Sequence, residues 1–177
     1  MDIIKKLIPV FIKDFIKAKI NGVKQNQKIY YCPVCDVSVS YFNRLPDYFF
    51  ELFDKYQFIH SVFNFETLNI VKYSCPNCGS ADKDRLYALF FKEYFLKIDH
   101  AHKYKFIDFA PSKGLATLIK NFNFLEYRSA DLFMEGVDDK ADLTNLVIYK
   151  DESVDFFLCS HILEHIHDDI KAIKELH

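Results

Sequence analysis

The sequence predicts an α/β protein in which a parallel sheet follows a small cysteine-rich module. Strand-like and helix-like segments alternate between residues 104 and 177, which is typical of a parallel sheet with helices on both faces. Two C-P-x-C motifs come before that region, one at Cys32 and Cys35 and the other at Cys75 and Cys78. The chain has 177 residues, of which 50% are hydrophobic, so it can bury a core and is expected to be globular.

The two cysteine pairs predict a structural zinc site with Cys32, Cys35, Cys75 and Cys78 as ligands. A two-residue spacer lets both sulfurs of a pair face one ion, and two such pairs complete a tetrahedral set of thiolates. The alternative is a pair of disulfides. The N-terminus shows no signal peptide, and a cytoplasmic compartment keeps such thiols reduced, so we expect zinc. The fifth cysteine, Cys159, lies in an apolar run and is expected to be a buried structural thiol.

Residues 1–27 are expected to form a basic amphipathic helix. Apolar residues recur at helical spacing, and lysines fill the positions between them, although Pro9 would kink the helix. Such a helix either lies on an anionic membrane surface or docks on its own protein. No apolar run is long enough to span a bilayer. We therefore expect a cytoplasmic protein and leave peripheral contact with a membrane surface open.

Residues 28–80 form the expected zinc-binding module, a ribbon-like unit. A strand over 28–31 leads into the first cysteine pair, and a strand over 71–74 leads into the second. An aromatic segment of helical character, 47–63, is inserted between them. The module is followed by a helix over 81–98. Its apolar residues near one broad face are Leu86, Leu89, Phe90, Tyr94 and Leu96.

Residues 81–177 form the second expected unit, which contains the sheet. The predicted strands span 104–109, 126–130 and 154–159. Helices are expected over 112–121 and 168–176. The strand over 154–159 is apolar throughout, and this character favours a place at the centre of a sheet.

The turn that follows the first of these strands is the candidate ligand site. It reads Asp108-Phe109-Ala110-Pro111-Ser112-Lys113-Gly114. Ligands of open α/β sheets bind at the carboxyl ends of the strands, and a turn of small residues lets backbone N–H groups approach them. The sequence contains neither G-x-G-x-x-G nor a P-loop here. Asp131 follows the next strand, at a position that typically binds ribose hydroxyls.

The segment 153–166, Ser-Val-Asp-Phe-Phe-Leu-Cys-Ser-His-Ile-Leu-Glu-His-Ile, resembles the fourth strand of a subgroup of class I S-adenosylmethionine-dependent methyltransferases. The D-x-A-P-x-x-G turn is similar to the first motif of that family. Some members also carry a zinc-binding C-P-x-C-G-S region followed by a basic helix, as this chain does from Cys75 to Arg85. The resemblance covers residues 28–177. It implies a Rossmann-like parallel sheet, of which this chain would hold the strands in the order 3-2-1-4.

The resemblance also implies roles for individual residues. The turn would line the methionine end and ribose of the cofactor, Asp131 would bind the ribose hydroxyls, and Asp142 with Leu143 would contact adenine. Ser160 and His161 would lie near the sulfonium, with His161 as the nearest candidate for a general base. The implied cofactor-binding residues are Asp108, Ala110, Pro111, Ser112, Gly114, Asp131, Asp142, Leu143 and Ser160.

Each of these positions also has a structural interpretation. Asp108 could satisfy backbone donors, Asp131 and Asp142 could cap the turns that follow them, and His161 could be a packed histidine. His161 and His165 also match H-x-x-E-H, a hydrolytic zinc motif. That motif belongs inside a helix, whereas here it follows a strand.

The leading functional expectation is a methyltransferase of unknown acceptor with a zinc module that shapes substrate access. Because the chain ends after the fourth strand, we expect little or no activity and an exposed apolar edge that favours self-association or a partner chain. The alternative is a zinc-ribbon module that binds protein or nucleic acid, joined to a non-catalytic remnant. The basic helix supports that alternative, whereas the net charge of −2 gives no general case for nucleic acid.

Overall fold

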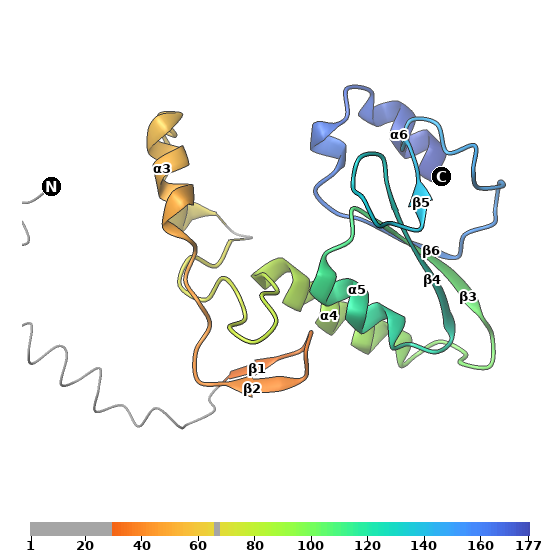
Figure 1. The fold of residues 1–177 in the computed structure, drawn as a ribbon, viewed down its shortest axis with the longest axis horizontal. Helices are drawn as coiled ribbons and strands as arrows, with labels where there is room; N and C mark the ends of the chain where they lie inside the picture. The colour runs from red at the N-terminus through yellow and green to blue at the C-terminus, as the bar shows by residue number, and fades with distance from the viewer. Residues whose placement is uncertain (1–29, 66–67) are drawn as a thin grey trace, which may run out of the picture.

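The computed structural model describes residues 30–65 and 68–177, so the helix expected over 1–27 lies outside the described residues. A hairpin of β1 (Tyr30–Cys32) and β2 (Val37–Val39) opens the described chain (Figure 1). The helix α3 (Asp47–Lys55) and the short 3-10 turn η1 (Val62–Asn64) follow. The longer helix α4 (Asp82–Phe95) then leads to the sheet.

A parallel sheet of four strands forms the centre of the remaining chain, as the sequence predicts. It consists of β3 (Tyr104–Phe109), β4 (Leu125–Asp131), β5 (Asp139–Lys140) and β6 (Phe156–Cys159). The spatial order is β5-β4-β3-β6, which is the expected order 3-2-1-4 in sequence numbering. All three pairings are parallel.

Successive residues of β3 serve opposite faces of the sheet. Phe106 belongs to a core shared with α4 and with α5 (Lys113–Lys120). Ile107 and Phe109 belong to a second core, which includes residues of η2 (Leu163–His165) and α6 (Asp169–Leu176). Helices therefore cover both faces, as expected for an α/β sheet (Figure 1).

The cysteine module and the sheet contribute to one hydrophobic cluster. Cys32, Val34 and Cys75 lie in the same cluster as Phe95 and Phe106, and none of these five is more than 6% exposed. The hairpin and the second cysteine turn pack on the α4 and α5 side of the sheet. The four-cysteine site therefore borders the hydrophobic core on this face of the sheet.

The segment between the two cysteine turns is less regular than predicted. The helix begins after Pro46 and ends at Lys55, well short of residue 63, and Gln57 takes a left-handed backbone conformation with φ 51°. The strand expected over 71–74 does not form. Only Ser74 makes bridges there, to Asn43 and Ala81. No residue of α3 is buried. Because helices in proteins are stabilised mainly by packing, the aromatic residues beyond Lys55 do not prolong this helix.

The helix α4 is confirmed, but its broad apolar face is exposed. The residues buried on the opposite side include Ala88, Phe91 and Phe95, which pack toward α5 and the sheet. The exposed residues are Leu86, Leu89, Phe90, Tyr94 and Leu96, with exposed fractions from 41% to 75%. The helix is apolar on two sides, so its pattern alone does not say which side the core takes.

Exposed apolar residues of α4 and β6 predict self-association. The strand β6 is an edge strand of the described sheet, its Phe157 is 46% exposed, and Tyr94 packs on Phe156 at 5.9 Å between ring centroids. An apolar edge of this kind favours pairing with another chain. We expect light scattering to show a mass that rises with concentration, and Phe90→Lys with Phe157→Lys to lower it.

Tyr56→Lys is the control for this prediction. Tyr56 is 71% exposed but lies just after α3, away from the sheet (Figure 1). A wild-type protein that stays monomeric at all concentrations would contradict the expectation, and so would an equal effect of the control substitution.

Candidate functional site

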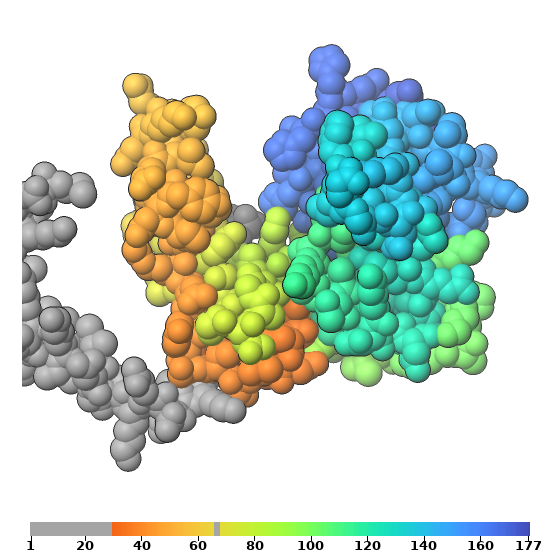
Figure 2. Space-filling model, viewed as in Figure 1, coloured from red at the N-terminus to blue at the C-terminus, as the bar shows by residue number. Residues whose placement is uncertain are grey.

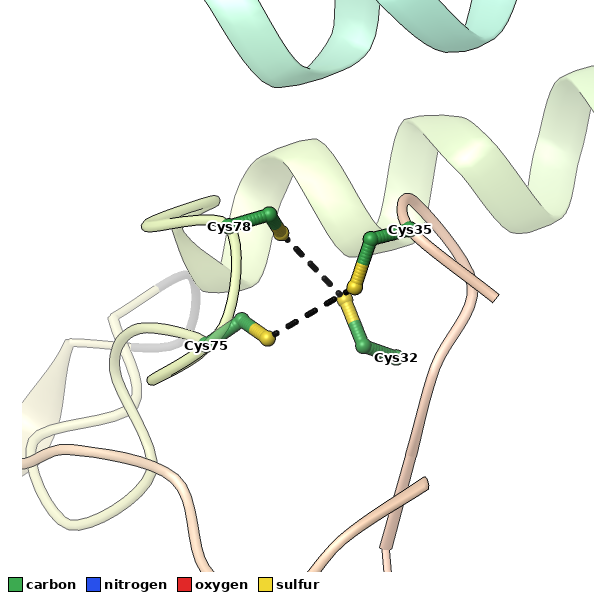
Figure 3. A group of neighbouring side chains, drawn as sticks. All are labelled: Cys32, Cys35, Cys75 and Cys78. Atoms are coloured by element: carbon green, nitrogen blue, oxygen red, sulfur yellow. Dashed lines mark hydrogen bonds between the residues drawn. The ribbon is translucent and has the colours of Figure 1, made fainter. Parts of the chain in front are cut away.

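Four cysteine sulfurs converge between the hairpin and the start of α4 (Figure 3). All four sulfurs lie within 4.8 Å of one another, with 3.8 Å between Cys32 and Cys78 and 3.9 Å between Cys35 and Cys75. A tetrahedral ion with metal–sulfur bonds of about 2.3 Å places its sulfurs about 3.8 Å apart. A disulfide needs about 2.05 Å, and all four cysteines are free thiols. The predicted grouping is confirmed, and the site can hold one metal ion.

Local backbone structure brings each pair of sulfurs together. Cys32 ends β1, and Cys35 lies in the turn before β2, where Asp36 has a φ of 55°. In the second pair, the N–H of Gly79 donates to the carbonyl of Cys75 at 2.8 Å. Gly79 has a φ of 75°, a conformation that costs other residues free energy. Gly79 therefore allows the tight turn that follows the second cysteine pair.

Two neighbouring side chains contact the sulfurs. Asn77 Nδ2 donates to Cys35 Sγ at 3.4 Å, and Ser80 Oγ lies 3.2 Å from Cys78 Sγ. The Cys78 thiol donates to the Ser80 hydroxyl; if a metal ion bound Cys78 as a thiolate, the hydroxyl would instead donate to the sulfur, because a thiolate can only accept. Outer contacts of this kind orient metal ligands and tune their affinity. Burial raises the pKa of the Cys32 thiol to about 12, so a cation is needed to hold it as a thiolate.

The carboxyl edge of the sheet provides the second candidate site. From β3 the chain adds β4 and then β5 on one side, and β6 returns to the other side of β3. Ala110 follows β3 and His161 comes soon after β6, and both have left-handed backbone conformations, with φ values of 52° and 56°. Such conformations are uncommon for residues other than glycine and cluster at functional sites. In open α/β sheets, ligands bind at this kind of switch point.

Asp108 points into the core on the α5 side of the sheet. It is 1% exposed and accepts a hydrogen bond from the Tyr127 hydroxyl at 2.9 Å. Burial is the main cause that raises the pKa of Asp108 to about 6, and Tyr127 opposes this shift. Its observed partner is a phenol rather than a backbone donor.

The raised pKa of Asp108 predicts a pH dependence of stability. In the unfolded chain the pKa of an aspartate is about 3.9, so between about pH 4 and pH 6 the folded state binds more protons at this residue. Its contribution to stability is therefore present below pH 4 and lost as the pH rises through about 6. We expect Asp108→Asn to be more stable than wild type above pH 6, by up to about 3 kcal/mol.

Urea unfolding of both proteins at pH 4.5 and pH 7.5 checks this expectation. The difference in unfolding free energy between Asp108→Asn and wild type should be larger at pH 7.5 than at pH 4.5. Asn keeps an acceptor for the Tyr127 hydroxyl, so the comparison isolates the charge. A difference that does not change with pH would show that Asp108 is already ionised at the lower pH.

The structure uses the other two predicted aspartates as turn caps. Asp131 Oδ1 accepts the N–H groups of Phe133 and Met134, at 2.7 and 2.6 Å. Asp142 Oδ1 accepts both the N–H and the hydroxyl of Thr144 at 2.8 Å. These contacts are the alternative roles considered for both residues. Leu143 is 6% exposed and lies in the core on the α6 side of the sheet.

The turn residues have definite contacts too. Ser112 is the N-cap residue of α5, but its hydroxyl donates to Asp84 Oδ1 at 3.2 Å instead of capping the helix. Pro111 lies between Ala110 and Ser112 and is half-buried. Gly114 lies in the first turn of α5, directly against Ser80. Asp84 carries no distinguishing pattern in the sequence, because its contact with Ser112 joins positions that are far apart along the chain.

Ser160 and His161 lie side by side after β6 but make separate contacts. Ser160 Oγ is hydrogen-bonded to the Tyr87 hydroxyl at 2.8 Å. His161 Nδ1 lies 3.1 Å from Glu164 Oε1, and both side chains are exposed. Tyr87 was not singled out from the sequence. Its place in the second turn of α4, among other aromatic residues, carries no distinguishing pattern.

A cleft of about 790 Å³ lies beside His161. Figure 2 shows a gap between the gold segment around α3 and the blue C-terminal segment. The residues that line the cleft come from η1, the segment before α4, the first half of α4 and the chain after β6. They are Phe63, Leu68, Asn69, Ile70, Val71, Tyr73, Asp82, Lys83, Leu86, Tyr87 and His161. Among the predicted site residues, His161 lines this cleft and the aspartates do not.

Arg85 fixes one wall of the cleft. Its guanidinium donates to the backbone carbonyls of Tyr73 and Ser80 at 2.9 and 3.2 Å, and to that of Lys72 at 2.6 Å. It also lies over the Phe42 ring, with the guanidinium carbon 4.1 Å from the centroid. This arginine therefore holds the inserted segment and the second cysteine turn against α4.

These features define an α/β domain that combines a parallel four-stranded sheet with a four-cysteine site able to hold a metal ion. Comparisons with protein-family models, with curated proteins and with solved structures found no match to this chain. In the part of the chain that the structure describes, no helix has the length and apolar character needed to cross a bilayer.

Proposed function

We propose that the chain is an S-adenosylmethionine-dependent methyltransferase domain with a Rossmann-like sheet, and that the four cysteines hold a structural zinc ion. The observation that carries the first part is the switch point between β3 and β6. There, Ala110 and His161, both in left-handed conformations, follow two adjacent parallel strands. Four thiolates in a closed tetrahedral arrangement are the usual ligand set of structural zinc, which supports the second part.

The residues at the sheet edge can hold the cofactor in a chemically reasonable way. Backbone N–H groups of the 110–114 turn can approach it, and Asp131 lies at the end of the neighbouring strand. Both capping bonds of Asp131 fall on Oδ1, and its Oδ2 makes neither of them. A ribose hydroxyl donating to Oδ2 would form a charge-assisted hydrogen bond. When bound, S-adenosylmethionine supplies an electrophilic methyl group.

The cleft beside His161 is the proposed acceptor site. Methyl transfer depends mainly on alignment of the acceptor with the methyl group, and the cleft walls can provide that alignment. The His161 ring lies at the cleft and contacts Glu164, a carboxylate that favours a ring orientation suited to accepting a proton. Tyr87, whose hydroxyl is hydrogen-bonded to Ser160 Oγ, also lines the cleft and offers a polar contact there.

A nucleic-acid-binding role receives less support from the basic residues around α4. Arg85 is occupied by three backbone carbonyls, Lys92 pairs with Asp36, and Lys97 pairs with Glu93. Binding to phosphates needs basic side chains that are available to the backbone of the nucleic acid. Only Lys83 of this group faces the cleft.

Binding of S-adenosylhomocysteine tests the proposed function. A ligand that binds only the folded state stabilises it, so this product should raise the melting temperature of the wild-type protein. Asp131→Asn should reduce that rise, because the neutral amide loses the charge-assisted bond to ribose. Asn keeps an oxygen that can cap the N–H groups of Phe133 and Met134, which preserves the turn.

The matched control is Asp168→Asn, in which an exposed capping aspartate at the start of α6 is neutralised. The proposal expects it to leave the shift unchanged, because Asp168 has no proposed contact with the cofactor. No shift of the wild-type melting temperature at millimolar ligand would contradict the proposed function.

A further inference from the structure

The first turn of α5 touches the second cysteine turn at Gly114. A Cβ atom on this residue would lie 2.3 Å from Ser80 Oγ, 3.3 Å from Val34 Cγ1 and 3.7 Å from Ser80 Cβ. The first of these distances is far shorter than any ordinary contact. Gly114 is therefore needed here for space, and its backbone lies within an ordinary helix.

Ser80 contacts the metal centre with the same oxygen atom. Its Oγ lies 3.2 Å from Cys78 Sγ, and the residue is only 4% exposed. The Ser80 hydroxyl accepts from the Cys78 thiol, and it would donate to the thiolate of a metal-bound Cys78, so in either state it cannot rotate away without losing that bond. Ser80 Oγ therefore lies between Cys78 Sγ and the backbone of α5 at Gly114.

A second contact joins the same two segments. Asp84, which is 8% exposed, accepts the N–H of Ala81 at 3.0 Å through Oδ2. Its Oδ1 accepts the Ser112 hydroxyl at 3.2 Å. The residue that follows Ser80 is therefore linked through Asp84 to the residue at which α5 begins. The 110–114 turn is therefore held from the side of the four-cysteine site at two positions, Ser112 and Gly114.

We propose that Ser80 is a positioning residue that couples the metal centre to the 110–114 turn. The metal-bound Cys78 thiolate holds the Ser80 hydroxyl, and Ser80 in turn sets the position of the α5 N-terminus. When the metal site is occupied, the backbone of the 110–114 turn is thereby held in the conformation that would bind the cofactor at the carboxyl edge of the sheet. This inference rests on the proposed function: the coupling between the metal and α5 rests on the zinc part of it, and the ligand part rests on the methyltransferase part.

A double-mutant cycle on Ser80 and Gly114 tests the coupling. Gly114→Ala in the wild-type background should force Ser80 away from Cys78 and speed zinc transfer to a chromophoric chelator by about tenfold, as for other outer-contact substitutions. Ser80→Ala should do the same, because it removes the hydroxyl. In the Ser80→Ala background, Gly114→Ala should change the rate by less than it does in wild type, because only the 3.3 Å contact with Val34 Cγ1 then remains tight and Ser80 Cβ lies at 3.7 Å.

The melting temperature should show the same dependence on Ser80. Gly114→Ala should lower the melting temperature of wild type by more than that of Ser80→Ala, because in the second background only the 3.3 Å contact with Val34 Cγ1 is tight and alanine favours a helix over glycine. Lys113→Ala, at an exposed position in the same turn, is the control and should leave zinc transfer unchanged. Additive effects of the two substitutions on zinc transfer would overturn the proposal.

Hydrogen exchange separates this inference from the proposed function. In zinc-loaded Gly114→Ala, amides of α5 should exchange faster than in wild type, whereas those of α6, on the other face of the sheet, should not. If α5 responds and S-adenosylhomocysteine fails to bind wild type, the coupling stands and the methyltransferase proposal fails. If the ligand binds wild type and α5 exchange is unchanged, the coupling fails and the methyltransferase proposal stands.

Discussion

Removing the metal from the four-cysteine site is expected to lower the melting temperature by more than about 10 °C. Cys32→Ser should have the same effect. Zinc binding contributes about 10–16 kcal/mol to the folding of small zinc domains, whereas a whole domain is stable by only about 5–15 kcal/mol. Because Cys32 and Cys75 lie in the same cluster as Phe95 and Phe106, the loss should reach the sheet as well.

Circular dichroism melts with and without a chelator, combined with metal analysis, measure this effect. We expect about one zinc per chain in wild type and less in Cys32→Ser. Cys159→Ser is the control, because Cys159 lies outside the four-cysteine site and packs in the other core. A melting temperature that is the same with and without metal would contradict a structural role for the site.

Phe95→Ala is expected to have the second largest effect, a loss of about 3–5 kcal/mol of unfolding free energy. Phe95 is 2% exposed, and its ring centroid lies 5.0 Å from that of Phe122 and 5.5 Å from that of Phe124. Phe91 and Phe156 also lie within 5.7 Å of it. Removing the ring leaves a cavity at the point where α4, the sheet and the residues after α5 meet.

The neighbouring residue provides a matched control for this prediction. Leu96 is 75% exposed, so Leu96→Ala should change the unfolding free energy by less than about 0.5 kcal/mol. Urea unfolding of both variants gives the comparison. Equal losses in the two variants would show that the described orientation of α4 is wrong.

Local patterns accounted for the parts of the fold that depend on short segments. The spacing of the cysteine pairs predicts their convergence because each pair needs only one tight turn. The alternation of apolar strands with helices predicts the parallel sheet. The strand β5, which has two residues, was not located, since so short a segment carries no periodic signal.

Contacts between segments that are far apart in the sequence determine the features of the fold that local patterns did not predict. The helix α4 has large apolar residues on two sides, and its contacts with α5 and the sheet bury Phe91 and Phe95 rather than Leu86 and Phe90. The fit of Gly114 against Ser80 depends on two distant segments meeting. No pattern along the chain distinguishes a glycine needed for ligand approach from one needed for packing.

The candidate cofactor residues show a related limit. An aspartate at a strand end can cap the next turn or bind a ribose, and the same position in the sequence allows both. Asp131 does cap its turn, through Oδ1. Asp108 faces the core and accepts a hydrogen bond from Tyr127 on the neighbouring strand β4. This partner is determined by the pairing register of β3 and β4, which the spacing of residues in the sequence does not reveal.

A nuclear magnetic resonance titration with S-adenosylhomocysteine tests the central claim most directly. The proposed function predicts that amide shifts change in the 110–114 turn, after Asp131 and at Ser160 and His161, which surround the switch point. Amides of α3, which lies apart from the sheet (Figure 1), should not change. Saturating ligand that leaves the amides around the switch point unchanged would contradict the account.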